Sequence, residues 1–304
     1  MSDLWRRSAS ELAALIARKE VSSREVVEAH LARIATVNPK LNAVVKVLAE
    51  EARKGADEAD RKVAAKDALG PLHGVPFTIK ENIDLAGAAT TWGLPAFARA
   101  VVPLDAPVVE RMREAGAVPI GRTNLPDMGL RVHTHSSLHG VTRNPWNAGR
   151  TAGGSSGGEA AALAAGMSPL GLGNDIGGSL RNPASACGIA SIRPSQGRVP
   201  DAGGIPAADR PLAVQMMQVN GPMARTVADV RRLALQVISG AHPRDPWSLD
   251  PPVARPRDAA ARRVAMVAEP PGGSTDPRVV EEVRKAGTAL RAAGYVVEEV
   301  APPR

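Results

Sequence analysis

The sequence predicts an α/β fold, because segments of strand type and segments of helix type alternate along the chain. A short run of strand type covers residues 75–80, and a helix near 107–115 is followed by a strand at 117–120. Close to the end, residues 263–300 have the pattern of a strand, a helix and a second strand. Such alternation is typical of a sheet covered by helices.

The first 66 residues predict helices. Two Ser-x-x-Glu sequences, at 8–11 and 22–25, have the form of a capping box, in which each side chain satisfies a free backbone donor at the start of a helix. The second box precedes apolar residues at helical spacing. Further helices are expected over residues 43–65 and near 226–239.

The last predicted unit consists of a strand at 263–268, a helix at 277–293 and a strand at 295–300. Asp276 is a suitable N-cap for this helix and Gly294 suits its C-terminal cap. Because such a strand normally leads into more structure, we expect the sheet to be incomplete at the C-terminus.

We expect a single domain over residues 1–304. It begins with a helical arm at 1–66 and continues with a core at 67–240, which carries the residues suited to chemistry. A Pro-rich break at 242–257 precedes the strand–helix–strand unit, at 258–304.

Composition and charge exclude several classes of protein. The net charge of +7 comes from scattered Arg residues, often beside acidic ones, and only 2% of residues are aromatic, so nucleic-acid binding is not expected. No stretch approaches the roughly 18 apolar residues of a membrane span, and residues 1–19 lack a signal-peptide pattern. A single cysteine, Cys187, excludes an internal disulfide. We therefore expect a cytoplasmic protein.

Three segments carry residues suited to chemistry. Lys80 ends the strand-type run, Ser155 lies in the Gly/Ser-rich stretch 153–158, and Ser179 follows Asp-Ile-Gly-Gly at 175–178. Glycines allow a tight turn and a close approach to a ligand, so successive backbone N–H groups can converge on one anionic oxygen. The amides of residues 176–179 would suit the oxygen of a tetrahedral intermediate.

A serine hydroxyl becomes a good nucleophile only when a base takes its proton, and the sequence offers no obvious His partner. A lysine can act as that base only when it is neutral, which requires burial or a nearby positive charge to lower its pKa. Ser155 could then pass the proton of Ser179 to Lys80, because a hydroxyl both donates and accepts.

Simpler interpretations remain open for each segment. A Gly/Ser-rich loop is most often a turn or linker, and the stretch 149–158 lacks the G-x-x-x-x-G-K-[ST] pattern of a phosphate loop. Three nearby histidines have no carboxylate or cysteine at a metal-binding spacing, so neither a metal nor a cofactor is expected. Cys187 is expected to be a buried structural thiol, and His73 a packing residue. The three histidines are His133, His135 and His139.

The combination of motifs resembles the amidase signature family, whose members are serine hydrolases with a Ser–Ser–Lys triad. The resemblance rests on the Gly/Ser stretch 153–158 and on residues 175–183, with a spacing of 24 positions from Ser155 to Ser179. Residues 74–81 resemble the lysine segment of the family, and 121–126 a turn that precedes the serine loop. The similarity covers the chain from about residue 8 to its end.

The resemblance implies a role for each matching residue. Ser179 is the nucleophile, Ser155 the bridging serine preceded by a cis peptide bond, and Lys80 the base. Asp175 and Arg181 are expected to form a structural ion pair. The resemblance further implies that the oxyanion hole is formed by Ile176, Gly177, Gly178 and Ser179. It also implies that the backbone of Gly129 lines the acyl site.

The resemblance also implies a mixed, twisted β-sheet with helices on both faces and the hydrolysis of a small-molecule carboxamide to an acid and ammonia or an amine. Relatives are often dimers, so a homodimer is expected. Ala152 and Asn174 differ from the usual family residues, and neither is expected to contact the triad residues. Two alternatives remain: the glutaminase-type subunit of a tRNA amidotransferase, which residues 181–183 disfavour, and a non-catalytic amidase-like fragment.

Overall fold

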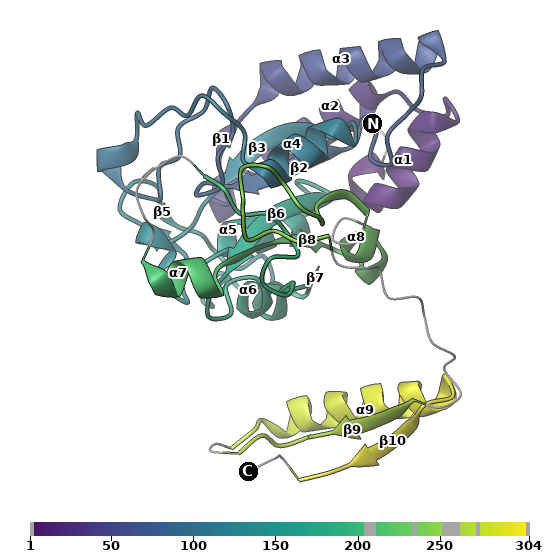
Figure 1. Ribbon diagram of the computed structural model, residues 1–304, viewed down its shortest axis with the longest axis vertical. Helices are drawn as coiled ribbons and strands as arrows, with labels where there is room; N and C mark the ends of the chain where they lie inside the picture. Colours follow the sequence, from purple (N-terminus) through teal and green to yellow (C-terminus); the bar gives the residue numbers. More distant parts are fainter. Residues whose placement is uncertain (1–2, 204–210, 233–235, 251–261, 272–273, 302–304) are drawn as a thin grey trace. The chain divides into compact units, whose positions relative to one another are not determined.

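A mixed six-stranded sheet forms the centre of the structure, a computed structural model in which residues 3–203, 211–232, 236–250, 262–271 and 274–301 are described. The three strands β3, β2 and β6 run parallel, and the outer pairs β1–β3, β6–β8 and β8–β7 are antiparallel (Figure 1). The strand order is β1 (Val44–Val47), β3 (Val118–Thr123), β2 (Pro76–Lys80), β6 (Leu170–Asp175), β8 (Val219–Ala224) and β7 (Ala190–Ser191).

The two central strands, β2 and β6, place the candidate catalytic residues. Every residue of both strands is buried. They pair in parallel, with Ile79 opposite Leu172, so their carboxyl ends lie at the same edge of the sheet. β2 ends at Lys80 and β6 at Asp175. In open α/β sheets, ligands bind outside the carboxyl ends of the strands, and this edge is therefore where a site is expected.

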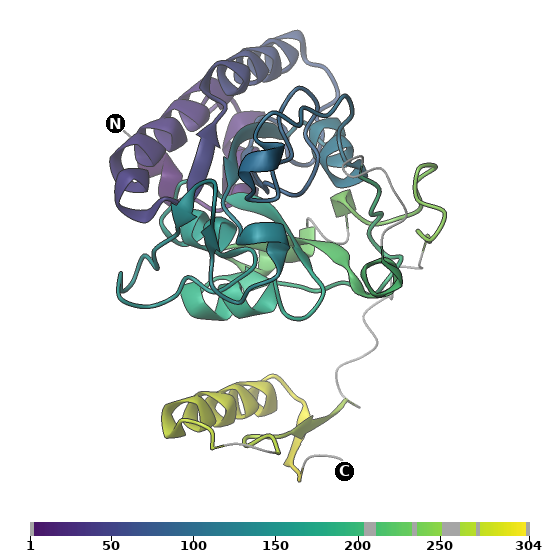
Figure 2. The same cartoon turned by 90° about the vertical axis from the view of Figure 1, so that its left-hand side faces the viewer.

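Helices and short turns surround the sheet (Figures 1 and 2). Both predicted capping boxes are present, at Ser8 before α1 and at Ser22 before α2. No described helix is long and apolar enough to cross a membrane. The elements are η1 (Asp3–Arg6), α1 (Ala9–Ala17), α2 (Ser23–Leu41), α3 (Ala49–Ala65), η2 (Pro95–Phe97), α4 (Pro107–Glu114), η3 (Asp127–Gly129), β4 (His135–Ser136), β5 (Gly140–Val141), α5 (Gly157–Ala164), α6 (Arg181–Cys187), α7 (Leu212–Met217) and α8 (Val227–Arg232).

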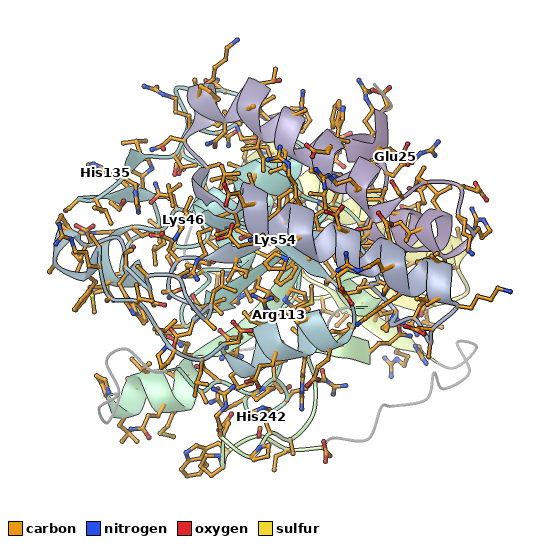
Figure 3. The ribbon with its side chains drawn as sticks, turned by 90° about the horizontal axis from the view of Figure 1, so that it is seen from above. Glu25, Lys46, Lys54, Arg113, His135 and His242 are labelled. Carbon is orange, nitrogen blue, oxygen red and sulfur yellow. The ribbon has the colours of Figure 1, made fainter. Side chains whose placement is uncertain are left out.

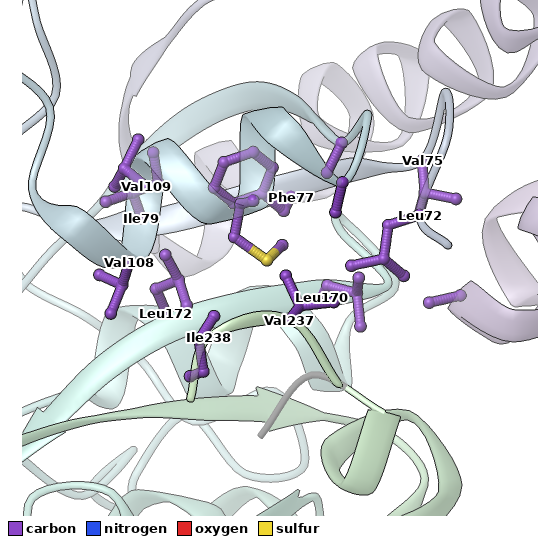
Figure 4. Close-up of a cluster of buried hydrophobic side chains, with 14 of the residues drawn as sticks. Leu72, Val75, Phe77, Ile79, Val108, Val109, Leu170, Leu172, Val237 and Ile238 are labelled. Atoms are coloured by element: carbon purple, nitrogen blue, oxygen red, sulfur yellow. The ribbon is translucent and has the colours of Figure 1, made fainter. Parts of the chain in front are cut away.

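Alternate residues of β2 face opposite layers of helix. Phe77 and Ile79 enter a hydrophobic cluster with Val108 and Val109 of α4, together with Leu170 and other side chains that Figure 4 shows. Thr78 lies on the other face, where its hydroxyl donates to the Glu159 carboxylate of α5. Both faces of the sheet are therefore covered by helices, as predicted.

The layer formed by α5 is packed with small residues. Ala160, Ala161 and Ala162 are completely buried, in a cluster that also holds Ile34 of α2 and Ile120 of β3. Gly158 approaches the backbone of Asn124 so closely that an added Cβ would lie 2.4 Å from the Asn124 N and O atoms. Close approach of main chains thus replaces the large aromatic contacts that this sequence lacks.

Two predicted helices differ from the structure. Within 43–65, residues Val44–Val47 form strand β1, because they pair with the edge of β3, and α3 begins only at Ala49. Of the helix predicted near 226–239, the structure shows α8 at Val227–Arg232, while residues 233–235 lie outside the described residues. Strand β8 and helix α6 were not predicted.

The chain divides into two compact units, Met1–Pro251 and Pro252–Arg304. The second unit is the predicted strand–helix–strand, β9 (Arg263–Met266), α9 (Pro277–Ala292) and β10 (Val296–Glu299), with the two strands in parallel. Asp276 is the N-cap, since its side chain accepts from the Arg278 N–H. The expectation that one domain includes both units stays a prediction.

Basic side chains in the first unit belong to several different elements rather than to one helix. Figure 3 labels Lys46 of β1, Lys54 of α3 and Arg113 of α4. Arg113 pairs with Asp105 at 2.9 Å, and Arg24 with Asp57 at 2.8 Å. The positive net charge is thus partly compensated locally.

Substituting Gly158 with Ala should destabilise the first unit by about 1–3 kcal/mol, because the new methyl group meets backbone atoms that cannot rotate away. Urea unfolding followed by tryptophan fluorescence measures this effect, since all four tryptophans lie in the first unit. Gly177→Ala is the matched control, because no atom lies within 4 Å of a Cβ added there. Equal unfolding midpoints for the two variants would contradict the packing argument.

Candidate active site

Lys80 is completely buried at the end of β2. Its Nζ lies 2.7 Å from Ser155 Oγ and 2.6 Å from Asn174 Oδ1. Burial lowers the pKa of Lys80 to about 7, and the carboxylates of Asp175 and Glu159 limit this shift because they favour the charged amine. A substantial fraction of the Lys80 amine is therefore neutral near pH 7, which a lysine needs in order to accept a proton.

Ser155 is held in the Gly/Ser-rich loop before α5, with 2% of its surface exposed. The peptide bond between Gly154 and Ser155 is cis. Glycine is required on the approach to Ser155, because a Cβ at Gly153 or Gly154 would lie 2.5 Å from backbone atoms of Pro183 and Arg131, respectively. The Thr134 hydroxyl also donates to the Gly153 carbonyl at 2.9 Å. The loop is therefore packed into the protein rather than acting as a flexible linker.

Asp175 shapes the turn that carries Ser179. Its two carboxylate oxygens accept from the N–H groups of Gly178 and Leu180, at 2.8 and 3.0 Å, and from Arg181 at 3.0 Å through two nitrogens. Burial alone would raise the pKa of Asp175, but these hydrogen bonds hold it below its ordinary value. The predicted ion pair with Arg181 is present, and it closes the turn on itself.

The predicted oxyanion loop has both free and engaged amides. The Gly178 N–H is engaged by Asp175. Across the described part of the chain, the N–H groups of Ile176, Gly177 and Ser179 donate to no acceptor. Space around Gly177 is open, since a Cβ there would meet nothing within 4 Å. The turn thus presents unpaired donors beside Ser179.

The structure brings Lys80 and Ser155 into direct contact, and Ser179 next to them through the backbone. The Ser156 N–H donates to the Ser179 carbonyl at 3.3 Å, which joins the two loops. Ser179 is half-buried, and its hydroxyl makes no hydrogen bond to the residues that the structure describes. It is therefore accessible to a ligand.

Asn174 was expected not to contact Lys80, Ser155 or Ser179, and this expectation is wrong. Its Oδ1 accepts from Lys80 Nζ, and its Nδ2 donates to Asn82 Oδ1 at 3.0 Å. Both asparagines lie near the carboxyl ends of the paired strands β2 and β6. Polar residues at these two ends are the sequence signal that could have indicated the contact.

Glu159 is a second residue that sequence analysis missed. It is completely buried on α5, and its carboxyl accepts from the hydroxyls of Thr78 and Thr123, the latter at 2.7 Å. Burial raises the pKa of Glu159 to about 7, although both threonine hydrogen bonds oppose the shift. The side chain lies on the same face of the sheet as Lys80, where it has room because Gly171 has no Cβ.

Gly129 lies against the candidate site. A Cβ on this residue would be 3.5 Å from Ser155 Oγ, and its φ of +70° favours glycine. Its neighbours in the sequence, Met128 and Leu130, line a surface hollow of about 760 Å³, together with Asp127, Arg131, His133 and His135. The position agrees with a surface that could receive part of a ligand.

Four of the remaining singled-out residues, His133, His139, Cys187 and His73, have structural partners. His139 pairs with Glu81 at 2.9 Å, and His133 with the Thr151 hydroxyl at 2.9 Å. Cys187 is buried, its Sγ donates to the Ala152 carbonyl, and burial raises its pKa to about 12. His73 contacts the Ala59 carbonyl. Within the described residues, no group of three His, Cys, Asp or Glu side chains could hold a metal ion.

Comparisons with known proteins agree on one family. A sequence model of the family described as Amidase matches residues 25–304. The chain is 47% identical over 300 residues to an indoleacetamide hydrolase of Bradyrhizobium diazoefficiens. It is 41% identical over 309 residues to one subunit of the glutamyl-tRNA(Gln) amidotransferase of Acidothermus cellulolyticus. These matches cover 99% and 100% of this chain, but 57% and 60% of the two relatives.

Solved structures give the same result. A 6-aminohexanoate cyclic dimer hydrolase matches with a TM-score of 0.87 and 35% identity, over 99% of this chain and 62% of that one. A bacterial aryl acylamidase of the amidase signature family matches with a TM-score of 0.85 and 30% identity, over 98% of this chain and 62% of that one. The chain thus spans about three fifths of the length of these relatives.

Replacing Glu159 with Gln should remove a pH dependence of stability. The pKa of Glu159 is 4.5 in the unfolded chain and about 7 in the fold, so the fold binds more protons between these values and loses stability as the pH rises through them. The loss is on the order of 3 kcal/mol. Urea midpoints at pH 5 and pH 8 should therefore differ less for Glu159→Gln than for the unaltered protein.

The control is Glu114→Gln, which changes an exposed carboxyl on α4 and should leave the pH dependence as it was. If the urea midpoints of Glu159→Gln and Glu114→Gln fell equally between pH 5 and pH 8, Glu159 would not be the group that causes the pH dependence.

Proposed function

Because the chain belongs to the amidase signature family, we propose that it hydrolyses a carboxamide through an acyl-enzyme formed on Ser179. The observation that carries the proposal is the contact of buried Lys80 Nζ with Ser155 Oγ, at 2.7 Å. An amine whose pKa has fallen to about 7 can take a proton near neutral pH, and a serine next to it can relay that proton.

The proposed reaction begins with a double proton transfer. Neutral Lys80 takes the proton of Ser155 as Ser155 takes that of Ser179. The Ser179 oxygen attacks the carbonyl carbon of the amide. The resulting oxyanion is stabilised by backbone N–H groups of the 176–179 turn, where those of Ile176, Gly177 and Ser179 have no acceptor among the described residues. Because Asp175 already fixes this turn, the donors need no reorganisation during the reaction.

Collapse of this intermediate breaks the carbon–nitrogen bond. The protonated Lys80, through Ser155, returns the proton to the leaving nitrogen, which departs as ammonia or an amine. A water molecule then loses a proton to the same relay and attacks the acyl-enzyme. The carboxylic acid leaves, and Ser179 regains its hydroxyl proton, so atoms and charges balance over the cycle.

The substrate we propose is a neutral aliphatic or aryl carboxamide. The hollow that Met128 and Leu130 line has these two apolar side chains. It also has one acidic side chain, Asp127, and one basic side chain, Arg131. Indoleacetamide hydrolase and aryl acylamidase, two of the similar proteins, have names that refer to aromatic amides. An aryl group attached to a carboxamide would suit such a surface.

A second candidate is the glutaminase-type subunit of a tRNA amidotransferase, which the 41% identity to a protein of that name favours. Against it, residues 181–183 read Arg-Asn-Pro, where that subfamily commonly has Arg-Gln-Pro. Ammonia release from glutamine, compared with release from an aryl acetamide by the same preparation, decides between the two. Preference for glutamine would favour the amidotransferase candidate.

A fluorophosphonate probe should label Ser179 alone. The probe needs a nucleophilic serine and an oxyanion hole but no knowledge of the substrate. Mass spectrometry of the digested protein locates the adduct, and Ser179→Ala should abolish it. A folded chain that acquires no adduct would support the third alternative, a non-catalytic amidase-like fragment, and would contradict the proposed function.

Replacing Lys80 with Ala should slow the labelling of Ser179 by roughly 10²–10⁴-fold, the usual contribution of a general base. In the unaltered protein the rate should rise about tenfold per pH unit below pH 7 and level off above it, because only neutral Lys80 accepts a proton. This rise should be missing in Lys80→Ala.

Lys46→Ala is the matched control, since Lys46 is an exposed lysine on β1 of the same sheet. It should keep the rate and its pH profile. Labelling of Lys80→Ala at the rate of Lys46→Ala would rule out Lys80 as the base.

A further inference from the structure

Resting on the proposed function, we infer that Asn174 and Asn82 form an amide pair that sets the direction in which the Lys80 lone pair points. Asn174 is then a positioning residue, which acts through Lys80 and touches neither substrate nor Ser179. The pair joins the ends of β2 and β6: Asn82 follows Lys80 by two residues, and Asn174 belongs to β6.

The contacts of Lys80 Nζ limit the directions in which its lone pair can point. Within the described part of the chain the amine forms hydrogen bonds with Ser155 Oγ at 2.7 Å and Asn174 Oδ1 at 2.6 Å. An amide oxygen accepts hydrogen bonds and never donates them. A neutral amine must therefore direct an N–H bond toward Asn174. Its second N–H bond and its single lone pair remain, and the lone pair faces Ser155 when the Ser155 hydroxyl donates to it, which is the geometry that proton transfer needs.

The orientation of the Asn174 amide decides whether the Lys80 lone pair is available to the Ser155 hydroxyl. If the amide were turned by 180°, its Nδ2 would face the lysine and would donate to the lone pair that Ser155 has to reach. Asn82 opposes this, because its Oδ1 accepts from Asn174 Nδ2 at 3.0 Å, and this hydrogen bond is lost if the Asn174 amide turns alone. Two asparagines are thus needed: one to accept from the lysine, and one to hold the first in place.

The chemistry of the amide also explains why a carboxylate does not occupy this position. Lys80 already faces two carboxyl groups, Asp175 at the end of β6 and Glu159 from α5. Both favour the charged amine, while burial favours the neutral one. A third carboxylate in contact with Nζ would hold the proton on Lys80. A neutral acceptor satisfies the N–H without doing so.

The experiment measures the ionisation of Lys80 directly and the labelling of Ser179 separately. Protein with ¹⁵N-labelled lysine and Ser179→Ala is titrated by NMR, and Lys80→Ala identifies the Lys80 resonance. Asn174→Asp should raise the midpoint by about 1–3 pH units, the usual effect of an adjacent opposite charge. Fluorophosphonate labelling at pH 7, with Ser179 intact, should then fall by 10-fold or more.

Two further variants separate positioning from charge. Asn174→Ala removes the acceptor, and Asn82→Ala frees the Asn174 amide to turn. Both should lower the high-pH plateau of the labelling rate, by about 10-fold or more for Asn174→Ala and less for Asn82→Ala, without raising the midpoint. Asn174→Ser, which keeps an acceptor oxygen, should recover part of the plateau.

Asn144→Ala is the matched control, because Asn144 and Asn174 are both 5% exposed. The Asn144 amide donates to the carbonyls of Thr151 and Ala186. It should cost stability but change neither the midpoint nor the plateau. An unchanged NMR midpoint in Asn174→Asp, or plateaus in Asn174→Ala and Asn82→Ala equal to that of Asn144→Ala, would overturn the inference. A shifted NMR midpoint in a protein that never labels would leave the amide pair standing and remove the proposed function instead.

Discussion

The buried amino group of Lys80 is the constraint around which the first unit is arranged. An isolated charged amine in a protein interior is costly, so the group must either lose its proton or find partners. Here it has acceptors on both sides, Ser155 and Asn174, and two carboxyl groups nearby. These partners come from separate segments of the chain. Asn174 and Asp175 reach Lys80 because β2 and β6 pair in parallel and end at the same edge of the sheet, whereas Ser155 and Glu159 come from α5 and the loop before it.

Sequence reasoning predicted the fold class, the capping boxes and the second unit, since each depends on signals within a few residues. It missed β8, which contains both Gly221 and Pro222 and so lacks a strand pattern. It also missed β1, whose four residues lie directly before a helix and form a strand only through pairing with β3. In both cases the deciding interaction is distant in sequence, and local propensity cannot show it.

The same limit applies to the site. Lys80, Ser155 and Ser179 could be selected because they lie in motifs whose spacing resembles a known family, and their proposed roles stay predictions. Asn174 and Glu159 were not selected, because single Asn and Glu residues in a sequence are most often solvated. Their contacts with the lysine strand follow from the register of β2 against β6 and from the packing of α5 on this face of the sheet, which only the three-dimensional structure contains.

Lys80 and Glu159 also depend on each other. Burial lowers the pKa of the amine and raises that of the carboxyl, so both are brought to about 7. Removing the proton from Glu159 creates a buried negative charge that favours a proton on Lys80, and a proton on Glu159 permits a neutral Lys80. The two Thr hydroxyls that reach Glu159 therefore have a second effect: by donating to the carboxyl they favour its charged form, and through it a proton on Lys80. The two sites titrate as a coupled pair, and the protonation of the base is a property of the sheet interior as a whole.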